Sequence, residues 1–181
     1  MNIIETKLKD CFILELRMFV DYRGVFFESF HKQNLESILG RTINFVQDNH
    51  SISKMGVLRG LHFQKGEAAQ AKLVRVIKGR VLDVVVDIRP ESPTFGKHIK
   101  VNLTAKNRDM LYIPKGMAHG FLALTEDAEL LYKCDNYYKP EMEGGIIFND
   151  SDIGIDWNFP IDQMILSQKD LKLPKLKDIK L

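Results

Sequence analysis

The sequence predicts an all-β protein, a double-stranded β-helix jelly roll with a few short peripheral helices. Three observations carry this prediction. Short runs of β-branched and aromatic residues recur at close spacing, with turn residues between them. Only one early stretch has the periodicity of a helix. The runs at residues 57–64 and 81–88 carry polar residues on one face, which is typical of strands that line a wet interior.

The N-terminal part of the chain is expected to hold two strands and a helix. Strands are predicted at residues 11–16 and 25–30, with Asp21-Tyr22-Arg23-Gly24 as a turn before the second. A helix is predicted at residues 31–39, because three aliphatic side chains of this segment fall on one side and Gly40 follows as a C-terminal cap.

The rest of the chain has the pattern of a series of short strands. Lys78-Gly79-Arg80 separates two of them, so residues 72–77 and 81–88 are expected to form a hairpin. Residues 169–181 mix five lysines with leucines and are expected to form a surface helix or tail. The remaining candidates are strands at residues 45–51, 57–64, 98–103, 110–113, 121–124 and 129–134, and a short apolar run at 146–148.

Two aspartates occur within the strand predicted at residues 81–88. Alternation places Asp83 and Asp87 on one face, together with two valines. An aspartate in the middle of a strand is unfavourable unless something requires it, so Asp83 is a candidate member of a functional network. Asp87 stands before Ile88-Arg89-Pro90 and is interpreted as a turn former.

Length and composition favour one soluble domain over residues 1–181. A chain of 181 residues is long enough to bury its own core, so it needs no disulfide or metal to fold. The 26 lysines and arginines nearly balance the 24 acids, which argues against nucleic acid or a membrane as the main partner. Cys11 and Cys134 are too few for a disulfide framework, and no apolar stretch suits an export signal or a membrane span. A reducing, cytoplasmic location is therefore expected.

The segment at residues 57–64 is where the sequence places the chemistry. It has the composition of a strand, yet it carries Arg59 and His62 within four residues. Strict alternation puts His62 and Leu58 on one face and Arg59 on the other. A bulge at Gly60 would turn Arg59 towards the face of His62. Taken alone, a single histidine of this kind is more often a hydrogen-bonded core residue than a functional one.

Six short motifs favour a functional role for His62. They are DYRGVFFE at residues 21–28, QDNHS at 47–51, RGLHFQ at 59–64, SPTFG at 92–96, IPKGMAHGF at 113–121 and NYY at 136–138. In this order they resemble motifs of the dTDP-4-dehydrorhamnose 3,5-epimerase family, over nearly the whole chain. The resemblance implies a cupin-type jelly roll, a homodimer, and catalysis without a metal or an organic cofactor. It also implies conversion of dTDP-4-dehydro-6-deoxy-D-glucose to dTDP-4-dehydro-L-rhamnose.

The reaction implied by the resemblance needs a base and an acid on opposite faces of a sugar. Carbons 3 and 5 flank the C4 ketone, so each can lose a proton to give an enolate and regain one from the other side. By the match to the family, His62 is the base, Tyr132 is the acid and Lys72 is the cation beside O4. Asp170 matches the carboxylate that orients the histidine. Without the family, Tyr132 would be interpreted as a core tyrosine and Lys72 as a solvated edge lysine.

Other family positions bind the rest of the substrate. Arg23 and Arg59 match residues that grip the diphosphate, a task that suits the guanidinium fork. Tyr138 matches the aromatic residue that stacks on the thymine ring, and Lys169 matches a nucleotide-sugar contact. The remaining matches to substrate-binding positions are Glu28, Gln47, Asp48, Asn49, Lys72, His119 and Glu143.

Three alternatives remain open from the sequence. A relative that inverts only C3 or only C5 would use the same base and acid. A metal-dependent cupin oxygenase is disfavoured. Metal-binding cupins have two histidines separated by one residue, and in this chain Gln64 stands where the second histidine would lie after His62. The second cupin block adds only His119. A nucleotide-sugar-binding module without activity needs no opposed acid and base, so the pair of His62 and Tyr132 argues against it.

Overall fold

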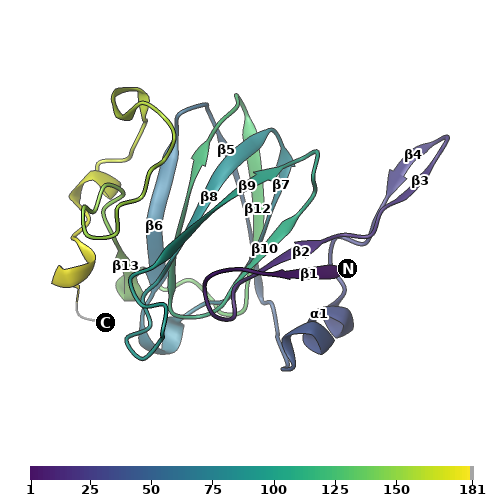
Figure 1. The fold of residues 1–181 in the computed structure, drawn as a ribbon, viewed down its shortest axis with the longest axis horizontal. Helices are drawn as coiled ribbons and strands as arrows, with labels where there is room; N and C mark the ends of the chain where they lie inside the picture. Colours follow the sequence, from purple (N-terminus) through teal and green to yellow (C-terminus); the bar gives the residue numbers. More distant parts are fainter. Residues whose placement is uncertain (180–181) are drawn as a thin grey trace.

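Two β-sheets face each other in the computed structural model, which describes residues 1–179 (Figure 1). All pairings between neighbouring strands of these sheets are antiparallel, which gives the double-sheet jelly roll predicted from the sequence. The six-stranded sheet has the order β1 (Asn2–Glu5), β2 (Phe12–Glu15), β10 (Met110–Ile113), β7 (Lys72–Lys78), β12 (Ala128–Cys134) and β5 (Gln47–Ser53). The five-stranded sheet has the order β13 (Glu143–Gly145), β6 (Leu58–Gln64), β11 (Met117–Ala123), β8 (Arg80–Asp87) and β9 (His98–Thr104).

Three apolar clusters stabilise the fold, one between the two sheets and one on the outer face of each sheet. Between the sheets, Val74 of β7 and Val85 of β8 belong to one cluster. A second cluster covers the outer face of the five-stranded sheet, where Trp157 of the C-terminal segment packs with Leu82. A third lies on the outer face of the six-stranded sheet and includes Leu35 of the helix. Alternate residues of one strand therefore serve different clusters, as the two-residue period of a strand requires.

The predicted helix is confirmed as α1 (Lys32–Leu39). It begins after His31, whose ring accepts a hydrogen bond from the backbone N–H of Asn34, and it ends at Gly40 in the left-handed conformation with φ of 63°. Within residues 1–179, α1 is the only α-helix, and no helix there is both long and apolar enough to cross a membrane. The peripheral 3₁₀ turns are η1 (Gly66–Ala68), η2 (Pro140–Met142), η3 (Ile161–Gln163), η4 (Asp170–Lys172) and η5 (Leu176–Asp178).

The prediction that β7 and β8 form a hairpin is wrong. The two strands have the predicted positions, but β7 pairs with β10 and β12, whereas β8 pairs with β11 and β9. The chain crosses from one sheet to the other at Gly79, which has φ of 75°. A Cβ at this position would lie 2.2 Å from the Thr125 hydroxyl oxygen, so the corner needs glycine. A short turn sequence cannot distinguish a corner from a hairpin, because both need a positive φ.

Most predicted strands are confirmed with ends shifted by no more than two residues, and the exceptions have local causes. The strand expected at 25–30 ends at Phe26, since Phe27 leaves the strand and lies under the Arg75 guanidinium. The strand expected at 121–124 begins at Met117, because the whole segment from there pairs with β8. The apolar run at 146–148 is buried beside β13 without being a strand. The exposed edge strand β1 has no buried alternation and is missed by the sequence pattern.

The lysine-rich end is not a regular helix. It forms the 3₁₀ turns η4 and η5, and Asp170 at the start of η4 is buried. The last two residues of the predicted tail, 180 and 181, lie outside the described residues. The segment packs back on the five-stranded sheet through apolar side chains that include Leu176 and Ile179. An apparently charged tail is therefore a covering layer of the fold.

A β-hairpin arm projects away from the two sheets (Figure 1). It consists of β3 (Phe19–Asp21) and β4 (Gly24–Phe26), which pair only with each other. The predicted turn at 21–24 forms its tip, where the Asp21 carboxylate accepts hydrogen bonds from Arg23. The arm exposes apolar side chains of its own, among them Val20 and Phe26. The Phe26 ring lies 6.3 Å from the Phe19 ring of the same arm, and both rings remain largely open to solvent.

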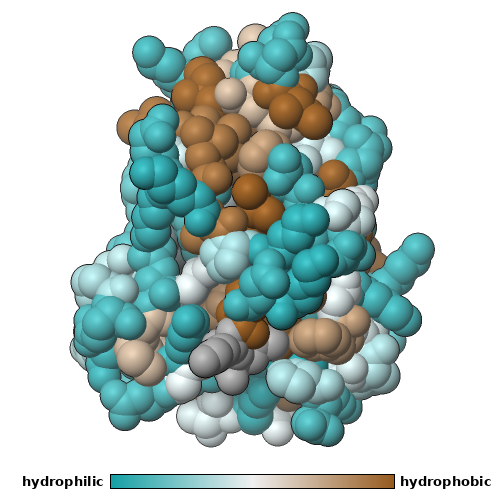
Figure 2. All heavy atoms as spheres, turned by 90° about the vertical axis from the view of Figure 1, so that its left-hand side faces the viewer, coloured by the Kyte–Doolittle hydropathy of each residue, from teal (hydrophilic) through white to brown (hydrophobic). Residues whose placement is uncertain are grey.

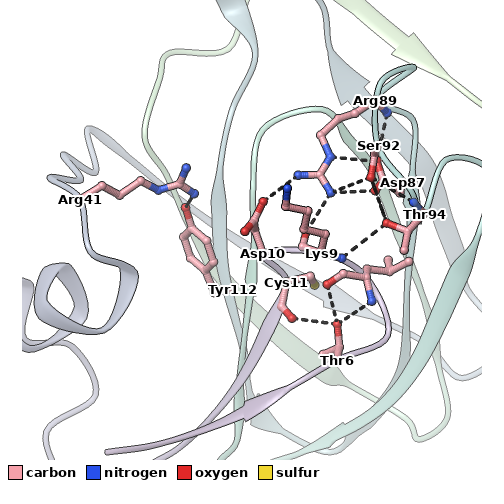
Figure 3. Close-up of polar contacts among 11 residues, drawn as sticks. Thr6, Lys9, Asp10, Cys11, Arg41, Asp87, Arg89, Ser92, Thr94 and Tyr112 are labelled. Carbon is pink, nitrogen blue, oxygen red and sulfur yellow. Dashed lines mark hydrogen bonds and ion pairs between the residues drawn. The ribbon is translucent and has the colours of Figure 1, made fainter.

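The interpretation of Asp87 as a turn former is confirmed. It is fully buried and accepts hydrogen bonds from Arg89, Ser92 and Thr94, and Arg89 also reaches Asp10 near the start of the chain (Figure 3). Burial opposes the charge of this carboxylate, but the hydrogen bonds prevail and lower the pKa of Asp87 to about 2. The cluster fixes the loop between β8 and β9 and takes no part in the cavity described next.

Candidate active site

A bulge in β6 brings Arg59 and His62 to the same side. Arg59 pairs with Phe121 of β11 and His62 pairs with His119, so β6 has one more residue between these pairs than β11. The bulge predicted at Gly60 is thus confirmed. Gly60 has φ of 128°, and a Cβ there would lie 2.6 Å from the Gly120 Cα.

The same bulge corrects the strict alternation assumed for β6. Leu58 was expected to share the face of His62, but it packs with Leu61 and Phe63 in the cluster on the outer face of the sheet. The extra residue at the bulge shifts the alternation by one position. Residues before Gly60 therefore point to the face opposite to the one that strict alternation with His62 predicts.

Two adjoining cavities open between the sheets. The first has a volume of about 560 Å³, and the second has a volume of about 270 Å³. His62, Lys72 and Tyr132 line both, so these three residues mark the junction. Of the other predicted site residues, the first cavity is lined by Arg59, His119, Lys169 and Asp170, and the second by Gln47, Asn49, Tyr138 and Glu143.

His62 and Asp170 form a hydrogen-bonded pair. The Nε2–H of His62 donates to the Asp170 carboxylate at 2.6 Å, so its other ring nitrogen, Nδ1, is left for a ligand. Burial lowers the pKa of His62, and the charge and hydrogen bond of Asp170 partly oppose this. The imidazole is therefore neutral near pH 7 and has the protonation state of a general base.

Asp170 reaches His62 because the C-terminal segment runs back along β6. Backbone hydrogen bonds join Leu58 to Ile165 and Ile165 to Gly56. The next residues lead to Ser167, whose hydroxyl accepts a hydrogen bond from the Asp170 N–H. The buried carboxylate thus has a fixed position, although 108 residues separate it from its histidine.

Tyr132 and Lys72 face His62 from the opposite sheet. They lie on the paired strands β12 and β7, and the Lys72 Nζ stands 5.7 Å from the centre of the Tyr132 ring. Burial raises the pKa of Tyr132 to about 12, so the phenol keeps its proton. Burial also lowers the pKa of Lys72, and the charges of Cys134, Asp83 and Glu143 oppose that shift. A neutral imidazole and a protonated phenol therefore lie on opposite walls of one cavity.

The second cavity gathers amide and carboxylate groups around Tyr138. The Tyr138 hydroxyl donates to Glu143 at 2.7 Å, and the Lys169 ammonium also contacts this carboxylate. Burial raises the pKa of Glu143, but these two hydrogen bonds and the charges of His62 and Lys169 together lower it overall. The Gln47 side chain accepts a hydrogen bond from the Tyr138 backbone N–H, which ties this aromatic residue to β5.

Three predicted substrate-binding residues lie outside both cavities. Arg23 and Glu28 are exposed, one at the tip of the arm and the other just after it. Asp48 lies on the outer face of β5 and contacts the Lys133 ammonium at 3.0 Å, since alternation separates it from Gln47 and Asn49. Within one chain, the fold does not bring these three side chains to the other predicted residues.

Several residues that line the cavities are not marked by the sequence pattern. Ser51 follows Asn49 on the inner face of β5, and its hydroxyl is the one buried side-chain oxygen or nitrogen without a hydrogen-bond partner among residues 1–179. Gln64 and Gln70 line the second cavity. The strand period would have found Ser51, but nothing in the local pattern marks Gln70, which lies outside a strand.

The cavity opens beside an apolar surface. Ile165 lines the first cavity and is half exposed, and Met55 and Ile161 are exposed near the backbone contact between Gly56 and the C-terminal segment. Figure 2 shows apolar side chains gathered over the upper part of the side of the molecule that lies on the left in Figure 1. Among the described residues, no three histidine, cysteine, aspartate or glutamate side chains come together as metal ligands, and independence from metal stays a prediction.

The fold and the cavity together define a class of protein, a cupin-type jelly roll with a cavity between its sheets that holds a histidine and a tyrosine on opposite walls. The family model described as dTDP-4-dehydrorhamnose 3,5-epimerase matches residues 5–178. The chain belongs to this family.

Individual relatives agree with the family assignment. The dTDP-4-dehydrorhamnose 3,5-epimerase of Salmonella typhimurium is 56% identical over 177 residues, which cover 97% of this chain and 96% of the relative. The enzyme of Elizabethkingia anophelis has a crystal structure that is similar with a TM-score of 0.95 and 51% identity, over 98% of this chain and 97% of that one. The Legionella pneumophila 3,5-epimerase, solved in complex with dTDP-4-keto-L-rhamnose, has a TM-score of 0.94 and 46% identity, over 99% and 94% of the two chains.

Proposed function

We infer that this chain is an isomerase that converts dTDP-4-dehydro-6-deoxy-D-glucose to dTDP-4-dehydro-L-rhamnose, by inversion at C3 and C5. The observation that carries the inference is the opposed pair of His62 and Tyr132 across one cavity. Family membership supports the substrate, since the Legionella relative was solved with the corresponding product. It also disfavours the metal-dependent oxygenase and the inactive binding module.

The proposed mechanism removes one proton from each centre and adds another from the opposite face. The Nδ1 of His62 takes the proton from the carbon next to the ketone, and the electron pair of that bond moves to O4 as an enolate. The Lys72 ammonium stabilises the negative charge on O4. Tyr132 then protonates the carbon from the opposite face, and solvent restores both residues. The same sequence of steps at the second carbon completes the conversion.

The inference is tested by proton NMR of the substrate with the enzyme in D₂O. Deuterium should enter at both C3 and C5, and only when the enzyme is present, because each inversion passes through an enolate. A 3′-monoepimerase from Streptomyces bikiniensis is 34% identical to this chain with a TM-score of 0.88, so the single-centre alternative has a structural relative. Label at C3 alone would replace the proposal by that alternative, and no label at either carbon would remove the epimerase assignment.

The acidic limb of the pH profile should belong to His62. The base must be neutral, and burial lowers its pKa below the ordinary 6.5, so kcat/KM should fall only as the pH drops below that value. Asp170 favours the charged imidazole and therefore raises the pKa of His62. Asp170→Asn should lower the plateau of kcat/KM and move its acidic limb to lower pH. A limb that stays in place or moves to higher pH would contradict this role.

We also propose that the enzyme works as a homodimer in which the arm of one protomer reaches the cavity of its partner. Arg23 matches a diphosphate-binding position, yet it stands on an exposed arm outside the cavities of its own chain. The arm carries Phe19, Val20 and Phe26 exposed, and apolar side chains such as Ile165 rim the cavity. Burial of both surfaces against each other would remove a large apolar area from water.

Mixed dimers test this assembly. Arg23→Ala and His62→Ala chains should each be nearly inactive alone, but mixing them should restore part of the activity. If Arg23 acts on the partner's cavity, a mixed dimer contains one cavity with both residues intact. Refolding each variant with itself is the control. Failure of the mixed sample to recover activity, or a monomer in sedimentation at the assay concentration, would refute the proposed arrangement.

A cytoplasmic location completes the proposal. Both cysteines are buried and free, which suits a reducing compartment.

A further inference from the structure

Asp83 is a carboxylate in the middle of the apolar core. It lies on β8 between Val81 and Val85, which belong to the cluster between the two sheets, and it is fully buried. Burial of an ionised carboxylate among apolar side chains is costly unless a partner compensates it. The partner of Asp83 therefore indicates why the strand retains this residue.

That partner is His119, on the neighbouring strand β11. The Nε2–H of His119 donates to both Asp83 oxygens, at 3.0 and 2.9 Å. No other hydrogen bond to this carboxylate occurs within residues 1–179. The bond therefore fixes both the orientation of the ring and the position of one proton, because a carboxylate acceptor requires the proton on Nε2.

The pair stands directly beside the catalytic histidine. His119 and His62 are paired residues of adjacent strands, and both line the first cavity. Each uses Nε2 for a carboxylate, Asp170 in one case and Asp83 in the other, which leaves each Nδ1 for the cavity. Asp83 also lies close enough to Lys72 to favour its charged form. The buried carboxylate thus acts on two groups of the cavity wall without lining it.

We propose that Asp83 is a positioning residue for substrate binding, which holds His119 with its Nδ1 directed to a substrate oxygen. Asp83 touches no substrate atom itself and acts through the histidine. The inference rests on the proposed epimerase function, because it assigns a role within the same cavity. Isotope exchange by the unaltered enzyme tests that function, whereas the variants below test only Asp83.

The test is Asp83→Asn, which keeps the volume of the side chain and removes its charge. An amide can turn either its oxygen or its NH₂ towards His119, so Nε2 no longer has to carry the proton. We expect kcat/KM to fall on the order of 10–100-fold, by analogy with the loss when a metal-bound histidine is deprived of its outer hydrogen-bond partner. Nitrogen NMR of labelled histidine should show the Nε2–H form of His119 in the unaltered protein, and a second tautomer in the variant. Unchanged kcat/KM together with an unchanged His119 signal would overturn the proposal.

Two further variants separate positioning from general loss of structure. Asp87→Asn is the matched control, since Asp87 is equally buried on the same strand but belongs to the cluster with Arg89 (Figure 3). It should lower the melting temperature and leave kcat/KM unchanged. His119→Gln retains a donor for Asp83, and adding Asp83→Asn to it should reduce kcat/KM little further. Fully additive losses, or an equal loss of kcat/KM in Asp87→Asn, would show that Asp83 does not act through His119.

Discussion

His62→Ala should abolish both epimerisation and isotope exchange at C3 and C5. The substitution removes the imidazole that is paired with Asp170, and no proton can then leave either carbon by this route. A positioned general base contributes ~10²–10⁴-fold, so the rate of exchange in D₂O should fall by at least that factor. Binding of dTDP, measured by calorimetry, should change little, since Arg59 and Tyr138 are untouched.

The matched control is His50→Ala. His50 lies on the outer face of β5, where it contacts Glu129 at 3.2 Å, and its loss should leave exchange at the wild-type rate. Exchange that continues in His62→Ala would assign the base to another residue. A loss of dTDP binding equal to the loss of rate would mean that the cavity had collapsed.

Tyr132→Phe should separate exchange from inversion. The ring and its packing beside Lys72 remain, but the proton donor on the opposite wall is lost. His62 can still form the enolate and return a proton or deuteron to the face from which it came. Deuterium should therefore enter the substrate while formation of the inverted sugar falls by ~10²–10⁴-fold. Proton NMR in D₂O measures both quantities in one sample.

Tyr112→Phe provides the comparison for this variant. Tyr112 is buried, and its hydroxyl accepts a hydrogen bond from Arg41 at 2.7 Å, but it lies on the outer side of the six-stranded sheet (Figure 3). Its removal should cost stability, about 1 kcal/mol for one hydrogen bond, and leave inversion intact. If Tyr132→Phe inverts C3 and C5 at the wild-type rate, Tyr132 is a core tyrosine and the acid must be sought elsewhere.

Local pattern was sufficient for most of the fold. Short β-branched and aromatic runs between turn residues marked nearly all strands of both sheets, and the spacing of apolar residues before Gly40 marked α1. The same pattern identified Asp83 as a residue that the strand would not carry without a reason, and Gly60 as the place of a bulge. These features depend on chain geometry over a few residues, so the sequence contains them in full.

Contacts between residues that are distant in sequence were determined only by the tertiary structure. Asp170 meets His62 because the C-terminal segment packs along β6, and no periodicity in a lysine-rich stretch predicts that contact. Gly79 turns the chain from one sheet to the other, where its sequence suited a hairpin equally well. The family motifs suggested which residues would meet, but they did not supply the partner of Asp83. A hydrogen bond between strands depends on which strands become neighbours in the sheet. The two-residue period of a strand fixes which side chains share a face, but it does not specify the neighbouring strand. The packing of the whole core determines that neighbour.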